Sequence, residues 1–303
     1  MDQTALVNPV RIDVFSLPEH LPAGYRPETA LFVDVLRATT TITAALSAGV
    51  KKILPVMEPK QALTMKKILE EADPARKGTI LLGGERKGVK IDGFDLGNSP
   101  ESYTPEVVGG KTLIFSTTNG TRAILIFERN SGTAEPVSQT FRPAKGGPSL
   151  RRIQNPPPQA AGTRYFLASF LNARELVSRL RAGGFRSVGI VCSGTDRRYT
   201  EEDILLAGLL VSRLAKEFET DSAEPRPLFN VQAETVRYLW ETFCETVTSE
   251  TFEKRLCAAL LESRGGQNLR RIKMTGDIHF AARLDSSTMI PEYRMGEIRP
   301  ATF

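Results

Sequence analysis

Two stretches of the chain place an arginine and several hydroxyl groups directly after an apolar, strand-like run. The first extends from Asp34 through Arg37 to the threonines at 39–41, and the second extends from Thr117 to Arg122. At a strand-to-helix turn the backbone N–H groups point outward, the helix dipole adds positive potential, and a guanidinium can clamp two oxygens. The two stretches therefore predict an anion site, and phosphate is the anion that suits it best.

Both stretches also have an ordinary structural interpretation. Asp34 could cap the helix that follows it, and the neighbouring threonines could be β-branched filler. The second stretch could be a common helix entry, although three polar side chains and a glycine before Arg122 favour an anion nest. Those four residues are Thr117, Thr118, Asn119 and Gly120.

Further polar residues follow other apolar runs or lie in a loop rich in turn-forming residues. They are Glu85, Arg86, Asp95, Asn98 and Asn172. In open α/β sheets, ligands collect beyond the carboxyl ends of the strands, so we expect these side chains to join the two stretches in one polar rim. For Glu85 and Asp95 the alternative is simple pairing with Arg86 and Lys87.

Cys192 ends an apolar run and lies six positions before Arg198, which is the C-x5-R spacing of phosphatases that use a thiolate nucleophile. Val191 stands where those enzymes usually place a histidine. A cysteine at the end of a buried strand is most often a small apolar residue. Both interpretations of Cys192 stay open. Downstream, the segment from Thr200 to Asp203 has the spacing of a capping box.

Short apolar runs alternate with amphipathic ones along the chain, which predicts an α/β fold with a sheet and flanking helices. The predicted strands are residues 11–16, 30–35, 52–56, 79–83, 112–116, 165–168 and 187–192. The predicted helices are residues 40–48, 59–71, 120–127, 172–182, 202–218 and a long stretch within 231–261. The loops at the strand ends would then form the anion site.

The composition bounds the class of protein. A chain of 303 residues with 41% hydrophobic content can bury a substantial core, and we expect residues 1–303 to form a single unit. No run of about 18 apolar residues predicts a membrane span, and the first residues lack the order of a secretory signal. Three widely spaced cysteines support neither a disulfide framework nor a zinc site. We expect a cytoplasmic protein without a membrane partner.

Residues 129–162 depart from the rest of the chain. The segment holds five basic residues against one acidic residue, a net charge of +4, together with many prolines and glycines and no apolar periodicity. This composition predicts an exposed, mobile insertion. A nucleic-acid-binding arm is the alternative, but Phe141 is its only aromatic residue. We therefore expect no nucleic-acid partner.

Four sequence blocks in one order closely resemble the 2-phosphosulfolactate phosphatase family, also called ComB. They are VDVLRATTT at 33–41, LGGER at 82–86, GFDLGNSP at 93–100 and TTNGTR at 117–122. The resemblance continues after the insertion through SFLNA at 169–173, CSGTD at 192–196 and EDILLAG at 202–208, and it returns more weakly at 276–278 and 284–285. About four fifths of the chain is covered.

The resemblance implies a ComB-like fold and a magnesium-dependent phosphomonoesterase that hydrolyses 2-phosphosulfolactate to sulfolactate and phosphate, a step of coenzyme M biosynthesis. Mg²⁺ takes oxygen ligands, and the candidates are Asp34, Glu85, Asp95 and Asp203. The donors expected to bind the small anionic substrate are Arg37, Arg86, Asn98, Thr117, Thr118, Asn119, Gly120, Arg122 and Asn172.

Two mechanisms are compatible with these residues. In the first, water attacks phosphorus in line while Arg37 and Arg122 stabilise the equatorial oxygens. In the second, Asp34 or Cys192 carries the phosphoryl group covalently.

Two other functions use the same rim: a phosphatase for other small phosphorylated 2-hydroxy acids, and a non-catalytic binder of phosphorylated or sulfonated metabolites. The sequence leaves the oligomeric state open, including a homo-oligomer.

Overall fold

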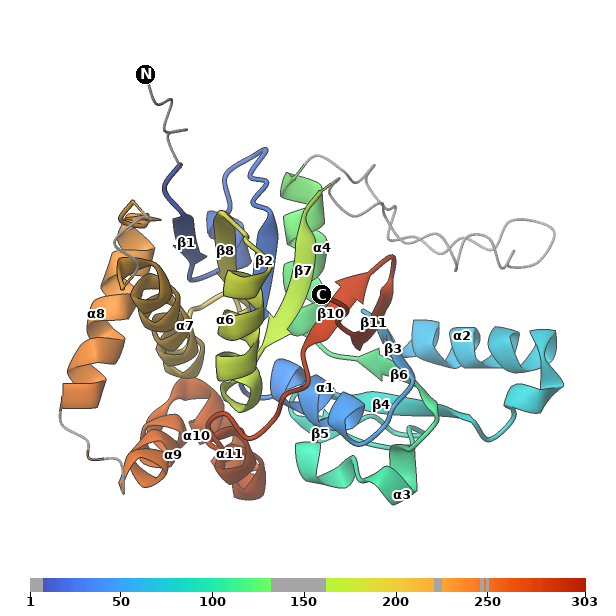
Figure 1. Cartoon of the computed structure of the whole chain (residues 1–303). Coiled ribbons are helices and arrows are strands. Elements are labelled where there is room, and N and C mark those ends of the chain that lie inside the picture. The colour runs from blue at the N-terminus through green and yellow to red at the C-terminus, as the bar shows by residue number, and fades with distance from the viewer. Residues whose placement is uncertain (1–7, 132–161, 221–224, 246–247, 249–250) are drawn as a thin grey trace.

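The computed structural model describes residues 8–131, 162–220, 225–245, 248 and 251–303 (Figure 1). Most of the predicted insertion at 129–162 lies outside these residues, and its expected mobility remains a prediction. Within the described part of the chain, no helix is long and apolar enough to cross a membrane.

The strands of the described residues form one sheet with the order β5-β4-β6-β3-β11-β10-β7-β2-β8-β1-β9. Their bounds are β1 Arg11–Phe15, β2 Thr29–Val33, β3 Lys52–Val56, β4 Ile80–Arg86, β5 Val89–Lys90, β6 Thr112–Ser116, β7 Arg164–Ala168, β8 Ser187–Cys192, β9 Leu228–Phe229, β10 Pro291–Arg294 and β11 Glu297–Pro300. All five residues of β2 are buried, as expected for a central strand covered on both faces.

The sheet consists of two parallel blocks joined by an antiparallel hairpin. One block is β7-β2-β8-β1-β9 and the other is β4-β6-β3, while β10 and β11 lie between them and pair antiparallel with β7 and β3. Because the path from β7 to β3 crosses three antiparallel pairings, the two blocks run in opposite directions. In a flat sheet their carboxyl ends would lie at opposite edges.

The sheet is not flat, and its shape brings the two sets of strand ends together. Figure 1 shows the first block upright and the second lying across it. The junction is narrow, since β11 pairs with β3 through Ile298 and Ile53 alone. The turns after β2, β4 and β6 therefore meet, as the contacts described below demonstrate.

Helices cover both faces of the sheet. Their bounds are α1 Ala38–Ser47, α2 Pro59–Ala72, α3 Pro105–Val108, α4 Gly120–Asn130, α6 Ala173–Ala182, α7 Glu201–Glu219, α8 Val231–Glu245, α9 Phe252–Glu262, α10 Arg264–Arg271 and α11 Thr275–Ala281. Helices α1 and α4 pack on the face that carries Phe32 and Tyr165, and α6 and α7 pack on the face that carries Leu31 and Phe166. This alternation along β2 and β7 is the two-residue period of a strand.

The α/β class predicted from the sequence is confirmed, and each predicted strand and helix overlaps an observed one. The prediction was incomplete, and the elements without a predicted counterpart include β5, β9, α3, α10 and α11. The long stretch within 231–261 is two helices, α8 and α9. The hairpin of β10 and β11 was missed, because its strands are four residues long and carry several charged residues and prolines. Such runs lack the apolar pattern that predicts a strand.

An aromatic cluster anchors α4 to the sheet. The ring of Phe127 lies 5.6 Å from that of Phe32 and 5.3 Å from that of Tyr165, both in edge-to-face geometry. Phe127 is only 1% exposed. Its burial fixes the axis of α4, whose first turn forms part of the candidate site.

We predict that Phe127→Ala lowers the free energy of unfolding by about 3–5 kcal/mol, because it removes a buried ring and leaves a cavity. Tyr238→Ala is the matched control, since this aromatic residue on α8 is 68% exposed. Its expected cost is about 0.5 kcal/mol or less. Urea denaturation followed by circular dichroism measures both, and equal costs would contradict the assigned packing.

Candidate active site

Asp34 stands at the end of β2 and contacts the first turn of α1. The backbone N–H and the hydroxyl of Thr39 both donate to the Asp34 carbonyl oxygen at 2.9 Å, and the N–H of Ala38 donates to Asp34 Oδ1 at 3.4 Å. Asp34 thus supports the first turn of α1, although the N-cap residue of this helix is Arg37. The second carboxylate oxygen of Asp34, Oδ2, faces Gly120, where an added Cβ would lie 3.3 Å away. Asp34 thus joins α1 to the turn that begins α4.

Glu85 brings the end of β4 to the same turn. Its Oε1 accepts hydrogen bonds from the Thr118 hydroxyl at 3.1 Å and from the Thr118 N–H at 3.4 Å, and its Oε2 accepts from the Gly88 N–H at 2.7 Å. Gly84 makes this approach feasible: its φ is +140°, and a Cβ there would overlap the carbonyl of Ser116. The expected alternative, pairing of Glu85 with Arg86 and Lys87, is not what the structure shows.

Asp203 connects two strand-end loops. Its Oδ1 accepts from the Val35 N–H at 2.9 Å and its Oδ2 accepts from the Gly194 N–H at 3.1 Å. The predicted capping box from Thr200 to Asp203 is wrong, because the Thr200 side chain makes no capping hydrogen bond and Asp203 faces the loops after β2 and β8. Asp203 orders the backbone beside Asp34 and remains a candidate metal ligand.

Glu202, which the sequence analysis missed, is a second buried acid at the start of α7, next to Asp203. It is 2% exposed, and its Oε2 has no hydrogen-bond partner within the described residues. Its Oε1 packs against Gly265 at the beginning of α10, where any added Cβ would overlap it. The available signal was the run of three acids at 201–203, of which we selected only Asp203.

Burial is the main cause of raised pKa values in Asp34, Glu202 and Asp203. Burial, with help from the charges of Glu85 and Glu202, raises the pKa of Asp34 to about 7. Burial raises the pKa of Glu202 as well, and the pKa of Asp203 rises through burial and then through the charges of Glu202 and Asp34. A group of acids that burial makes costly to ionise is stabilised by a cation.

The charge of Arg37 acts on Asp34 against the larger effect of burial, but both Nη groups of Arg37 are engaged elsewhere. Its Nη1 donates to Asp277 Oδ2 at 2.6 Å and its Nη2 donates to the Gly88 carbonyl at 2.6 Å. Both side chains of the ion pair are almost fully buried, and Ser99 Oγ donates to the other oxygen of Asp277 at 2.5 Å. Arg37 therefore fixes the loop between β2 and α1. Asp277 was missed as a site residue, although it lies in a block that resembles the family.

The turn between β6 and α4 has the features of an anion nest. The first N–H groups of a helix have no partner within the helix, and here they follow the hydroxyls of Thr117 and Thr118. Asn119 is the N-cap residue, and its side chain makes no capping hydrogen bond. Arg122, in the first turn of α4, forms an ion pair with Glu19. Burial and the charge of Arg197 lower the pKa of Arg122.

The structure does not bring Asp95 into the acidic group. Asp95 Oδ2 accepts from the N–H of Leu82 at 2.7 Å and lies 3.6 Å from the ammonium of Lys66. Leu82 precedes Glu85 by three strand residues, about 10 Å along β4. Lys66, which the sequence analysis did not consider, is thus the charge partner of Asp95.

Two predicted substrate-binding residues, Asn172 and Arg86, make contacts within the fold. The Asn172 amide oxygen accepts two hydrogen bonds from Ser169, and its nitrogen donates to the carbonyls of Leu167 and Met289. This side chain therefore has no hydrogen-bonding capacity left for a substrate. Arg86 donates to the Met57 carbonyl and to Ser116 Oγ, and thus ties the ends of β3, β4 and β6 together. These assignments correct the expectation for Asn172 and give Arg86 a structural role.

Asn98 differs from these two residues, because its amide oxygen is buried without a hydrogen-bond partner in the part of the chain that the structure describes. The side chain is 5% exposed. The Thr41 hydroxyl donates to the Asn98 backbone carbonyl and fixes this loop against α1. Asn98 remains a candidate for substrate binding.

Cys192 is fully buried at the end of β8, and its thiol lies 3.7 Å from the Asp203 carbonyl. Burial, with the charges of Asp203 and Glu202, raises the pKa of the thiol well above its ordinary value. A nucleophilic thiolate needs the opposite environment. The structure therefore favours the small apolar residue over the nucleophile that was the other expectation.

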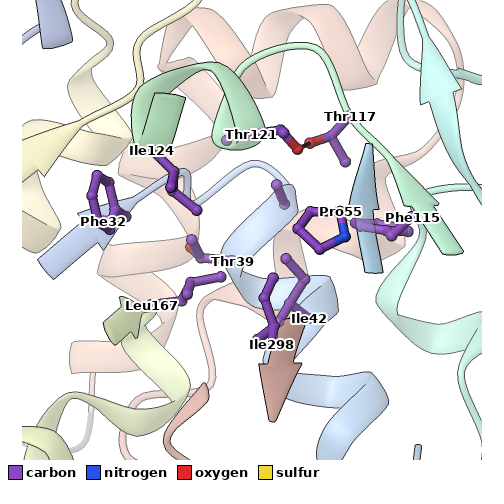
Figure 2. Close-up of a pocket in the computed structure, with 12 residues that line it drawn as sticks. Phe32, Thr39, Ile42, Pro55, Phe115, Thr117, Thr121, Ile124, Leu167 and Ile298 are labelled. Carbon is purple, nitrogen blue, oxygen red and sulfur yellow. Dashed lines mark hydrogen bonds between the residues drawn. The ribbon is translucent and has the colours of Figure 1, made fainter. Parts of the chain in front are cut away.

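A small cavity lies directly behind the Gly120 turn (Figure 2). Figure 2 shows Phe32, Ile124 and Leu167 around it, with the hydroxyls of Thr117 and Thr121 3.4 Å apart at its edge. Its volume is about 10 Å³, room for about one water molecule. The cavity is too small for a phosphorylated metabolite, and it reflects how closely α1 and α4 pack behind the turn.

The donor set fits a hard cation such as Mg²⁺. Asp34, Glu85 and Glu202 supply only oxygen, and the unpartnered Oε2 of Glu202 gives the group one oxygen that the fold does not use. Among the described residues, no three acidic, histidine or cysteine side chains form a ready metal cage. Mg²⁺ commonly binds through one or two carboxylates, with waters and phosphate oxygens as the remaining ligands, so a complete protein cage is not required.

Comparison with known proteins gives a consistent picture. The family model described as 2-phosphosulpholactate phosphatase matches residues 15–133 and 158–296. The chain is 33% identical to a probable 2-phosphosulfolactate phosphatase of Symbiobacterium thermophilum, over 89% of this chain and 92% of that protein. It is 33% identical to one of a Synechococcus species, over 92% and 93%, and 30% identical to one of Caldanaerobacter subterraneus, over 90% and 91%.

We predict that Asp277→Asn lowers the free energy of unfolding by about 3–5 kcal/mol, because it leaves the buried Arg37 guanidinium without a counter-charge. The double variant Arg37→Met/Asp277→Leu should lose less than Asp277→Asn, since it removes both charges and keeps apolar volume. Glu71→Gln is the control, because it breaks the exposed pair with Lys67 at a cost of about 1 kcal/mol or less. A cost for Asp277→Asn no larger than that of Glu71→Gln would refute the assignment. Urea titration supplies all three values.

Proposed function

The chain belongs to the 2-phosphosulfolactate phosphatase family and is a phosphoric monoester hydrolase, and from this premise we propose that it hydrolyses 2-phosphosulfolactate to sulfolactate and phosphate with the help of Mg²⁺. Where coenzyme M is made, this reaction would be one step of its synthesis. The relatives are named for this activity and are about one third identical to the chain. The identity of the substrate and the use of Mg²⁺ therefore need support from the geometry of the site.

The approach of Asp34 to the Gly120 turn is the observation that carries the proposal. A carboxylate oxygen faces the start of α4, which is the part of the fold best suited to receive phosphate. Two anions in one place repel each other unless a cation lies between them. An acid group beside an anion nest is therefore the arrangement that a metal-dependent phosphatase requires.

Asp34 would hold the metal, together with Glu85 or Glu202, and Asp203 would keep the adjacent backbone in place through Val35 and Gly194. When bound, Mg²⁺ would reduce the negative charge of the phosphate and orient the attacking water. Asp95 is left out of this set, because Leu82 and Lys66 hold it farther along β4.

The chain's own groups account for the binding of the phosphoryl group. The N–H groups at the start of α4 and the hydroxyl of Thr117 would donate to its equatorial oxygens, where charge develops during in-line attack by water. The hydroxyl and N–H of Thr118 already donate to Glu85. Arg122 would add a guanidinium from the first turn of the helix. Arg37 acts indirectly, since its pair with Asp277 positions the loop that carries Asp34.

A covalent route through Asp34 is the competing mechanism, and it would give a burst of product and a trappable acyl phosphate. Rapid quenching with labelled substrate distinguishes the two routes. Cys192 is not proposed as the nucleophile, because its thiol is buried and its pKa is raised.

We predict that the purified protein releases inorganic phosphate from 2-phosphosulfolactate in the presence of Mg²⁺, and that a chelator abolishes the release until excess Mg²⁺ restores it. A panel of other phosphorylated 2-hydroxy acids, assayed in parallel, ranks the substrates by kcat/KM. No metal-dependent release from any member of the panel would refute the proposed function. A higher kcat/KM for another member would change the substrate and retain the reaction.

We predict that Asp34→Asn lowers kcat by about 100-fold or more, because it removes the carboxylate expected to hold the metal beside the anion nest. Asp92→Asn is the matched control, since Asp92 is an exposed acid in the loop after β5, and its activity should stay within about twofold of wild type. Thermal melts of both variants verify folding. Near-wild-type turnover by Asp34→Asn would exclude both the metal-ligand role and the covalent role of Asp34.

A further inference from the structure

Two arginines lie near each other beside the anion nest, and only one of them is paired. Arg122 of α4 forms an ion pair with Glu19, which is 39% exposed. Arg197, in the loop after β8, is exposed and has no ion pair or hydrogen-bond partner among the residues that the structure describes. The Arg197 turn packs against the segment that carries Glu19, because a Cβ added at Gly194 would lie 2.5 Å from Leu17 Cδ2. Burial, and then the charge of Arg197, lowers the pKa of Arg122. Two guanidinium groups and one carboxylate leave this place with a net positive charge.

The turn that carries Arg197 is tight. Thr195 N–H donates to the Arg198 carbonyl at 2.9 Å, and Arg198 N–H donates back to the Thr195 carbonyl at 3.0 Å. The two residues at its tip, Asp196 and Arg197, have φ values of 52° and 58°. The left-handed region is uncommon for residues other than glycine and costs free energy. Contacts with the rest of the fold must therefore hold the tip in this conformation.

Those contacts connect the turn to the candidate active site. Ser193 N–H donates to the Val33 carbonyl at 2.8 Å, and Gly194 N–H donates to Asp203 Oδ2 at 3.1 Å. Asp196 at the tip lies 3.6 Å from the guanidinium of Arg264. Asp203 also receives the N–H of Val35, so one carboxylate positions both the Arg197 turn and the loop that carries Asp34. These contacts hold the Arg197 turn at a defined place, beside the segment whose Glu19 pairs with Arg122.

The spacing suits a short substrate with more than one acid group. Arg122 follows Gly120 by two residues, which is about 3 Å along the helix axis. A phosphate at the Gly120 turn would leave a neighbouring carboxylate or sulfonate within reach of Arg122 and of a long side chain beside it. Guanidinium groups bind such planar or tripodal oxygens through paired hydrogen bonds. Glu19, half exposed, would be the group that such an acid displaces.

We propose that Arg122 and Arg197 form the subsite for the acid group of the substrate that does not react, and that Arg197 is a specificity-determining residue. The inference rests on the proposed function for the identity of the substrate. It assigns to the loop after β8 a contribution to substrate choice that is separate from the chemistry at Asp34.

Calorimetric titration with two ligands in the presence of Mg²⁺ tests the subsite without relying on turnover. Sulfolactate carries a carboxylate and a sulfonate but no phosphate, whereas inorganic phosphate carries only the reacting group. Arg197→Asn keeps a residue that tolerates the left-handed conformation, and we expect it to weaken sulfolactate binding about 10-fold or more, as for the loss of a charge-assisted hydrogen bond. The ratio of the sulfolactate Kd to the phosphate Kd should rise by a similar factor.

Three further variants sharpen the test. Arg197→Lys retains the charge without the planar fork and should recover part of the affinity. Glu19→Gln removes the competing carboxylate and should tighten sulfolactate binding. Arg198→Ala, at the next position of the same turn, is the matched control and should leave both Kd values within about twofold of wild type.

The outcomes separate the two proposals. An unchanged sulfolactate Kd in Arg197→Asn, an equal loss of affinity for both ligands, or the same loss in Arg198→Ala would overturn the subsite. Failure of the wild-type protein to bind sulfolactate would overturn it as well. If the subsite behaves as expected but no phosphate is released from phosphosulfolactate, the proposed reaction fails and the acid-binding site stands.

Discussion

The buried ion pair between Arg37 and Asp277 is the interaction on which the candidate site depends. It joins the loop after β2 to α11, and through the Gly88 carbonyl and Ser99 it also reaches the β4–β5 hairpin and the loop before α3. These segments lie far apart in the sequence. A buried charge without its partner is costly, so the pair tolerates little change in how the segments meet, and Asp34 is held at the position that this geometry sets.

The second constraint is the excess of negative charge around Asp34. Burial makes ionisation of Asp34, Glu202 and Asp203 costly, yet a protein that needed only stability would place apolar residues there. The fold keeps the acids and satisfies them partly, with backbone N–H groups from Val35 and Gly194. The remaining free-energy cost of ionising these buried carboxylates is explained by the proposed role of the group, which is to bind a cation and, through it, an anion at the start of α4.

The direction of the strands adds a topological constraint. Two parallel blocks run in opposite directions, so an ordinary open sheet would separate the turns after β2 and β6. The C-terminal hairpin joins the blocks through short pairings, with a single residue pair between β11 and β3, and the sheet turns at this junction (Figure 1). The site therefore forms by a route that differs from the common rim of one parallel sheet, and it depends on residues near the end of the chain.

Local patterns were enough to predict the α/β class, the main strands and helices, and the turns that carry Asp34, Glu85 and Thr117, because apolar period and turn chemistry are local properties. Such patterns could not predict which acidic side chains lie close together in the folded protein. Asp95 lies outside the acidic group, whereas Glu202, which was not predicted, belongs to it. Asp277 is the ion-pair partner of Arg37, although 240 positions separate the two residues in the sequence. These pairings emerge from the folded chain alone, since burial and charge partners depend on how distant segments pack, and no local pattern records them.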